Sequence, residues 1–181
     1  FRTCPSKHKY FLCLFNCYST VNVHLEKALA KWNILRHFER ELILRKQQIA
    51  VENLLLGRDV LAVLPTCFGK KMIFTIYLLA KLEFEKQATN DTTVCIVVFP
   101  PLISIICDQI AEMESLAFTA VELTNETLKS ILLHKPQFIY CSAENATSQS
   151  FLEALRAELH NSMAAIVVNK PHTVETCTRK R

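Results

Sequence analysis

The chain has 181 residues, of which 50% are hydrophobic and 21% are charged. A chain of this size and composition can bury the core of one globular domain, which excludes an intrinsically disordered protein. Its formal net charge of +4 permits an anionic partner such as nucleic acid without requiring one. No apolar run reaches the ~18 residues that a transmembrane helix needs, so we expect no membrane association.

The cysteine pattern argues against a disulfide framework, although the chain has eight cysteines. Three of them lie inside apolar runs, where a free cysteine packs as a small hydrophobe: Cys95, Cys107 and Cys141. We therefore expect a reduced, intracellular setting. Cys13, Cys17 and His24 are open to two interpretations, a zinc site or an incidental pair of cysteines. The incidental pair is favoured because no CxxC motif is present, and we predict no structural metal.

The first predicted elements precede the sheet. Residues 1–24 include the apolar stretch YFLCLFNCY, which contains an asparagine and lacks a convincing cleavage site for a signal peptide. We treat them as an N-terminal segment of unknown role, followed by one domain over residues 25–181. The apolar spacing predicts amphipathic helices from Leu25 to Phe38 and from Arg45 to Leu56, the second ending at Gly57.

The rest of the chain alternates between apolar strands and helix-like stretches. The predicted strands are Val60–Leu64, Val94–Phe99, Phe138–Cys141 and Ala164–Val168, with Thr119–Leu123 as a weaker fifth. The predicted helices between them are Lys70–Lys86, Leu102–Leu116, Thr127–His134 and Ser148–His160. Continuous apolar strands that alternate with helices predict an α/β fold, with a parallel sheet covered on both faces. Ligands of such sheets bind at the carboxyl ends of the strands, so the segments after the strands are candidate sites.

The first candidate is LPTCFGKK, Leu64 to Lys71, at a strand–helix junction. In such a loop, backbone N–H groups and a helix N-terminus can hold phosphate oxygens, and Lys70 would reach the β- and γ-phosphates. The alternative is an ordinary turn with two solvated lysines. The Gly-Lys dipeptide alone does not decide between them.

Two further blocks follow later strands. FPPLISIICDQI starts a helix with Pro101 near its first turn, where proline is favoured, and this block has an alternative reading as a core helix. CSAEN places Ser142 and Glu144 at another strand end, and its alternative is a turn and helix cap before Ser148.

The last block, AAIVVNKPHTVETC, completes an ordered set of four. A strand followed by four polar or turn residues ending in His172 is where superfamily 2 helicases carry Asp-Glu-x-His. With the other three blocks in the same order, the chain from about Leu25 onward resembles the first RecA-like motor domain of the RecQ-type ATP-dependent DNA helicases. The resemblance implies a P-loop NTPase fold of the RecA type, DEAD/DEAH-type motifs, and ATP and Mg²⁺ as cofactors.

The resemblance also implies roles for individual residues. Gln47 matches the glutamine that reads adenine, with Gln48 as the alternative. The residues that match the phosphate loop are Thr66, Cys67, Phe68, Gly69, Lys70 and Lys71. The residues that match the nucleic-acid-binding blocks are Pro101, Leu102, Ile103, Ser104, Ser142 and Glu144. His172 matches the histidine that couples the nucleotide site to DNA binding.

Four positions depart from the family pattern, and all of them bear on the chemistry. Cys67 replaces a glycine, and its Cβ crowds the phosphates. Lys71 replaces the Ser or Thr whose hydroxyl ligates Mg²⁺, and an ammonium has no lone pair to donate. Asn169 replaces the aspartate of the Mg²⁺ shell, and Lys170 replaces the glutamate that activates water. We therefore predict that no catalytic or metal site is intact and that ATP and Mg²⁺ bind weakly or not at all.

The expected protein is thus a RecQ-like motor domain that is catalytically dead and is found in the nucleus, with single-stranded or forked DNA as its partner. Because the chain starts at Phe1 and ends just after the Asp-Glu-x-His position, we expect a fragment without the second motor domain. One alternative is a non-enzymatic pseudo-helicase whose basic surface, formed by Lys70, Lys71, Lys170 and residues 178–181, binds nucleic acid or a partner. Another is an unrelated α/β protein with a chance Gly-Lys pair.

Overall fold

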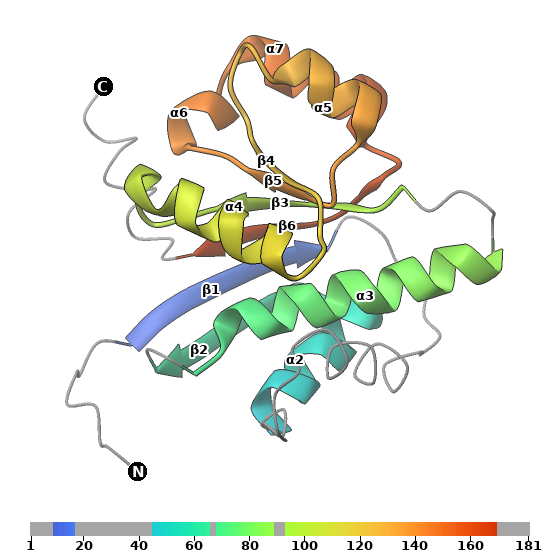
Figure 1. Cartoon of the computed structure of the whole chain (residues 1–181). Helices are drawn as coiled ribbons and strands as arrows, with labels where there is room; N and C mark the ends of the chain where they lie inside the picture. Colours follow the sequence, from blue (N-terminus) through green and yellow to red (C-terminus); the bar gives the residue numbers. More distant parts are fainter. Residues whose placement is uncertain (1–8, 17–44, 66–67, 89–92, 170–181) are drawn as a thin grey trace.

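The structure is a computed structural model, and it describes residues 9–16, 45–65, 68–88 and 93–169 (Figure 1). Several sequence-based expectations fall outside these residues. They are the helix predicted over Leu25–Phe38 and the roles assigned to Thr66, Cys67, Lys170 and His172.

The centre of the fold is a six-stranded sheet with the strand order β2-β1-β6-β3-β5-β4. The strands are β1 (Lys9–Asn16), β2 (Val60–Pro65), β3 (Cys95–Phe99), β4 (Ala120–Glu122), β5 (Phe138–Tyr140) and β6 (Met163–Asn169). The four strands β6, β3, β5 and β4 run parallel, as the sequence predicts, and each of the five predicted strands is present. This arrangement confirms the predicted α/β fold of the RecA type.

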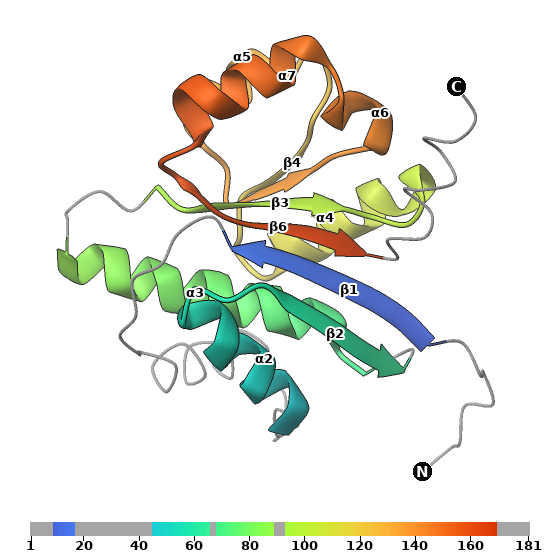
Figure 2. The same cartoon turned by 180° about the vertical axis from the view of Figure 1, so that it is seen from behind.

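Strand β1 is a difference from the prediction, because sequence analysis assigned residues 9–16 no secondary structure. It lies between β2 and β6 and runs antiparallel to both, with Lys9 opposite Pro65 and Leu12 opposite Asn169 (Figure 2). Its paired residues are at least 46 positions away in sequence, as for Leu14 and Val60, and a local apolar pattern does not report such distant pairing.

Helices cover both faces of the sheet (Figure 1). They are α2 (Arg45–Leu55), α3 (Lys70–Ala88), the 3₁₀ turn η1 (Ile103–Ile105), α4 (Ile106–Ser115), α5 (Leu128–His134), α6 (Ala143–Ala146), α7 (Gln149–Ala154) and the π-helical turn η2 (Leu155–Leu159). The helix predicted from Leu102 thus begins with a 3₁₀ turn, and the one predicted from Ser148 ends with a π-helical turn. None of the helices within the described residues is long and apolar enough to cross a membrane.

Strand β3 has a continuously apolar sequence because both of its faces are covered by helices. Ile96 and Val98 pack into the core that α2, α3 and α4 cover, whereas Cys95 and Val97 pack into the core on the side of α5 and α7. All four side chains are buried, as expected for a parallel strand between two helical layers.

Helix α2 ends at Leu55, one residue before its predicted end, and Gly57 closes it as predicted. This glycine has a φ of 77°, in the left-handed region that favours glycine. The Gly57 N–H donates to the Leu54 carbonyl, and the Arg58 N–H donates to the Asn53 carbonyl. These two bonds form a Schellman motif, which stops α2 and turns the chain into β2.

Candidate phosphate-binding site at the carboxyl edge of the sheet

The candidate loop connects the end of β2 at Pro65 to the start of α3 at Lys70. Gly69 in this loop has a φ of +63°, and a Cβ added to it would lie 2.7 Å from the Gln47 Nε2 atom. Both the backbone conformation and the close approach of Gln47 therefore favour glycine at this position.

Gln47 reaches the loop from α2, and its side chain is buried. Its Nε2 atom donates hydrogen bonds to the carbonyl oxygens of Phe68, at 2.6 Å, and Gly69, at 3.2 Å. Gln48, the alternative candidate, is exposed and donates to Glu52 within α2. Of these two glutamines, Gln47 is the one that the structure brings to the loop.

Lys70 lies back over the end of β2. Its Nζ atom donates to the carbonyl oxygens of Leu64, at 3.3 Å, and Pro65, at 2.8 Å. The side chain is therefore held at the loop, which argues against a freely solvated lysine. The first turn of α3 contains no acidic residue, so the positive end of the helix dipole and Lys70 together favour an anion here.

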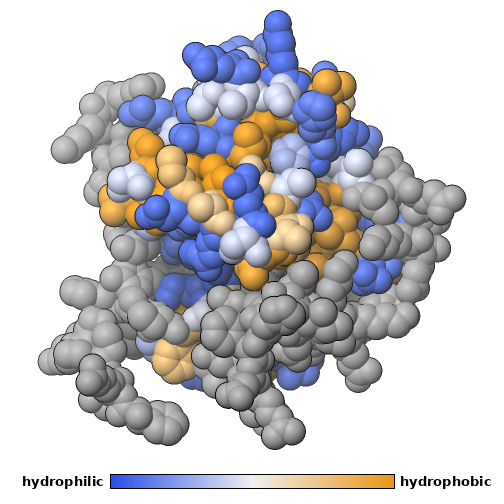
Figure 3. All heavy atoms as spheres, viewed as in Figure 1, coloured by the Kyte–Doolittle hydropathy of each residue, from blue (hydrophilic) through white to orange (hydrophobic). Residues whose placement is uncertain are grey.

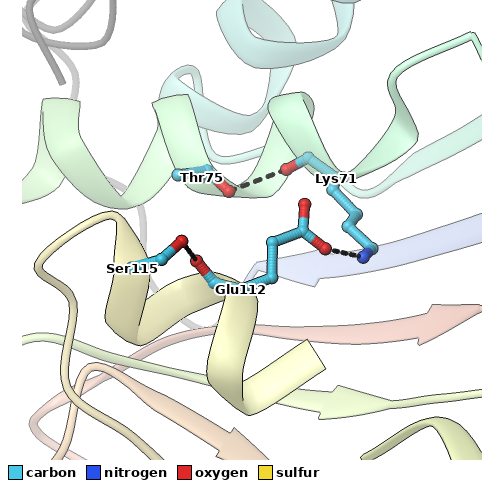
Figure 4. A network of polar contacts seen from close by, with 4 residues as sticks. All are labelled: Lys71, Thr75, Glu112 and Ser115. Carbon is cyan, nitrogen blue, oxygen red and sulfur yellow. Dashed lines mark hydrogen bonds and ion pairs between the residues drawn. The ribbon is translucent and has the colours of Figure 1, made fainter. Parts of the chain in front are cut away.

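Lys71 is held by a different partner. Its Nζ atom forms an ion pair with Oε2 of Glu112 on α4 (Figure 4). The two side chains are 39% and 38% exposed, and pairs with this much exposure stabilise a protein by only about 0–1 kcal/mol. The pair thus adds little stability, but it neutralises the charge of Lys71 and joins the start of α3 to α4.

The surroundings of this ion pair are ordered by short-range hydrogen bonds. The Thr75 hydroxyl donates to the Lys71 carbonyl at 2.9 Å, and the Ser115 hydroxyl donates to the Glu112 carbonyl at 2.7 Å (Figure 4). Burial raises the pKa of Tyr140 well above its usual range, and the Glu112 carboxylate adds to this shift. Glu112 therefore raises the pKa of Tyr140 in addition to forming the ion pair with Lys71.

The block after β3 is an exposed apolar turn. Leu102 and Ile103 are 59% and 60% exposed, and Ser104 is also exposed. Leu102 occupies the N-cap of the 3₁₀ turn without a side-chain cap bond. Figure 3 shows hydrophobic residues at the surface around α4. The core-helix alternative therefore does not describe Leu102 and Ile103, which are exposed. It does describe later positions such as Ile106 and Met113, which are buried.

The block after β5 takes the geometry of a helix cap. Ser142 is buried and is the N-cap of α6, where its Oγ atom accepts a hydrogen bond from the Asn145 N–H at 3.1 Å. Ser148 caps α7 in the same way. Glu144 is exposed in the first turn of α6. The cap alternative therefore describes the local structure of this block.

Comparison with known proteins identifies the family. The family model described as DEAD/DEAH box helicase matches residues 44–180, a range that includes Gln47, the candidate loop and His172. The chain belongs to this family.

The chain is also similar to the ATP-dependent helicase wrn-1 of Caenorhabditis elegans, with 32% identity over 128 residues. The match covers 67% of this chain and 11% of that protein, so the chain spans only a small part of its relative's length. The predicted resemblance to RecQ-type helicases is thereby confirmed, and the alternative of a chance Gly-Lys pair is wrong.

Helicases of this family use Mg²⁺ with ATP, but the described residues of this chain do not fit the metal. The Lys71 ammonium has no lone pair and is paired with Glu112, and Asn169 at the end of β6 offers a neutral amide. The Asn169 Oδ1 atom is buried, and it has no hydrogen-bond partner among the described residues. In the part of the chain that the structure describes, no three His, Cys, Asp or Glu side chains are grouped so as to hold a metal ion.

Sequence analysis missed the part that Glu112 plays in this helicase domain. Glu112 and Lys71 are 41 positions apart, and neither residue has a local pattern that indicates the other. The only signal was that α4 follows β3, whose carboxyl end lies at the same edge of the sheet as the end of β2, so a charged residue of α4 could reach the start of α3.

Proposed function

We propose that this chain is a RecQ-like helicase motor domain that binds polyphosphate and nucleic acid weakly and does not hydrolyse ATP at a significant rate. The observation that carries this proposal is the Lys71–Glu112 ion pair, because it occupies the position where the family has a hydroxyl ligand of Mg²⁺. The family membership supports the binding functions, and the substituted positions support the loss of hydrolysis.

The size of the loss follows from the chemistry. Phosphoryl transfer depends almost wholly on positioning and on electrostatic stabilisation around the metal. Removal of one such group raises a barrier by roughly 2.7–4 kcal/mol. Lys71, Asn169 and Lys170 replace three of these groups, so we expect almost no residual rate, although such effects do not simply add.

The proposed roles follow the family pattern over a domain that we place at residues 25–181, after an N-terminal segment at 1–24. Residues 66–70 bind phosphate, and Gln47 reads adenine while it supports the loop. Residues 101–104, Ser142 and Glu144 contact nucleic acid, and His172 couples the two sites.

The test is ATP hydrolysis by the purified chain, with and without single-stranded DNA. We expect the same rate for the chain and for its Lys70→Ala variant, within error. DNA-stimulated hydrolysis that exceeds the rate of Lys70→Ala would show that the site is catalytically competent.

A non-enzymatic role in binding nucleic acid is the second candidate. The exposed turn at Leu102 and Ile103 and the lysines of α3 favour it, because apolar contacts with bases and ionic contacts with phosphates are independent of hydrolysis. Affinity for single-stranded DNA should then fall steeply as salt rises. Binding that does not change with salt would contradict this role. A nuclear location is part of the same proposal, and imaging of the tagged chain tests it.

A further inference from the structure

We infer that the side of β2 and β1 that faces away from α3 binds an amphipathic α-helix of a partner protein. Leu61 and Val63 of β2 are 59% and 43% exposed on this side. Val168 of β6, on the same side, is partly buried. These three residues, with β1 between the two strands, form what we call the apolar strip. The inference does not depend on nucleotide or nucleic-acid binding.

The two sides of β2 differ in their cover but not in their polarity. Ala62 and Leu64 are buried in the core beneath α2 and α3, and the alternate residues Leu61 and Val63 point to the other side of the sheet. A strand with one solvated side normally carries polar residues on that side. The sequence of β2, VLAVLP, contains none. It is therefore the sequence of a strand that is covered on both sides.

The apolar strip continues across the neighbouring strands. The register of β1 sets Cys13 opposite Leu61 of β2 and opposite Val168 of β6. Val168 follows Val167, which is buried on the side of α3, so Val168 lies on the same side as Leu61. With strands about 4.8 Å apart and ~3.3 Å per residue, the strip is roughly 14 Å wide and 20 Å long.

The helical layer on this side of the sheet ends beside the apolar strip. The core beneath α5 and α7 includes described residues of β3, β4, β5 and β6, but none of β2. Ile166 of β6 packs against that core, so the strip begins where the layer ends. In Figure 2, β2 lies in front of α3, and α5 and α7 lie over the other half of the sheet. A helix on the strip would extend this layer.

The dimensions of the apolar strip favour a helix over a second copy of the chain. A helix is about 10–12 Å across and rises ~1.5 Å per residue, so one helix of about 14 residues covers the strip. Two facing strips of roughly 14 by 20 Å bury far less than the ~800 Å² per partner of a standard stable interface. The layer of α5 and α7 also stands about one helix diameter above the sheet beside the strip, and it would keep a second sheet at a distance.

The chemistry of the partner helix follows from the strip and from the charge of the chain. An apolar stripe at helical spacing would contact Leu61, Val63 and Val168. The chain has a formal net charge of +4, so acidic residues on the outer side of the helix favour association. Because the contact is small, we expect a dissociation constant on the order of 10–100 μM.

The experiment is a titration of the full chain into a labelled peptide of about 14 leucine and glutamate residues, with the leucines at helical spacing and binding read by fluorescence anisotropy. A second peptide has the same composition in scrambled order and should bind at least tenfold more weakly. The striped peptide should also gain helicity in difference circular dichroism, since so short a helix is marginal alone. The double variant Leu61→Thr/Val63→Thr keeps β-branched residues in the strand and should weaken binding at least tenfold.

The matched control is Leu133→Thr on α5, at a side chain that is 77% exposed and lies outside the strip. It should bind like the parent chain, and thermal unfolding should show that every variant is folded. If the double variant does not fold, Val63→Thr alone decides, and it should weaken binding severalfold.

Three results would overturn the inference. The first is no binding of the striped peptide, and the second is equal binding of both peptides or of the parent chain and the strip variants. The third is a dimer in sedimentation experiments that the strip variants separate, because a second copy of the chain would then occupy the strip.

Discussion

The buried core of this domain has the apolar packing that its fold requires, whereas the carboxyl edge of the sheet departs from the family pattern. In the core, apolar side chains from β3, β5 and α3 pack on the two faces of the sheet, as a fold of this class requires. At the edge, the loop has Gly69 and Lys70, and we propose that Lys71 and Asn169 stand in place of the metal ligands of the family. Burial therefore maintains the fold without the chemistry of the edge, and the two regions should respond differently to substitution.

The largest expected effect is in the core. Phe138 is fully buried and lies edge-on to the rings of Phe74 and Phe118, with centroid separations of 6.0 and 5.4 Å. Phe138→Ala should lower the free energy of unfolding by about 3–5 kcal/mol because it leaves a cavity. Urea unfolding measures this change, and Leu133→Ala, at a side chain that is 77% exposed, is the control.

A Phe138→Ala variant that unfolds like the parent would show that the core is loosely packed. Substitutions in the core would then not cost more stability than substitutions at the edge, contrary to our expectation.

Much of the core could be predicted from the sequence, because the strands buried on both faces are continuous apolar runs. Val94–Phe99 and Ala164–Val168 were predicted to within one residue at each end. A turn and helix cap before Ser148 was predicted as one of two alternatives, whereas the short helix α6 that Ser142 caps was not predicted. Strand β1 and the Lys71–Glu112 pair were not predicted, since both join residues that are distant in sequence and depend on the folded chain.

The second effect is at the loop. Gly69→Ala should destabilise the protein by about 1–2 kcal/mol because a residue with a Cβ is strained at its φ of +63°. The new Cβ would also push away the Gln47 amide that holds the loop. Urea unfolding measures the loss, and polyphosphate affinity should fall with it.

A double-mutant cycle separates these two causes. In a Gln47→Ala background the clash is absent, so the remaining loss from Gly69→Ala reports the backbone strain alone. Equal losses in both backgrounds would show that the close approach of Gln47 contributes nothing.

The third effect is at the Ser142 cap of α6. Ser142→Ala should lower the free energy of unfolding by about 1 kcal/mol, because the Asn145 N–H loses its acceptor. Ser142→Thr keeps a hydroxyl and should retain most of this stability. Chemical denaturation measures both variants. If Ser142→Ala weakens DNA binding at a temperature where it is fully folded, the hydroxyl has a role at the edge beyond the cap.

The smallest effect on stability should come from the ion pair itself. Glu112→Gln should change the free energy of unfolding by less than about 1 kcal/mol, since both partners are partly exposed. Urea unfolding measures this change, which should be several times smaller than that of Phe138→Ala, as expected for the edge compared with the core. A loss of several kcal/mol would instead mean that the pair holds α3 against α4, and that Lys71 stands in this position for the stability of the fold.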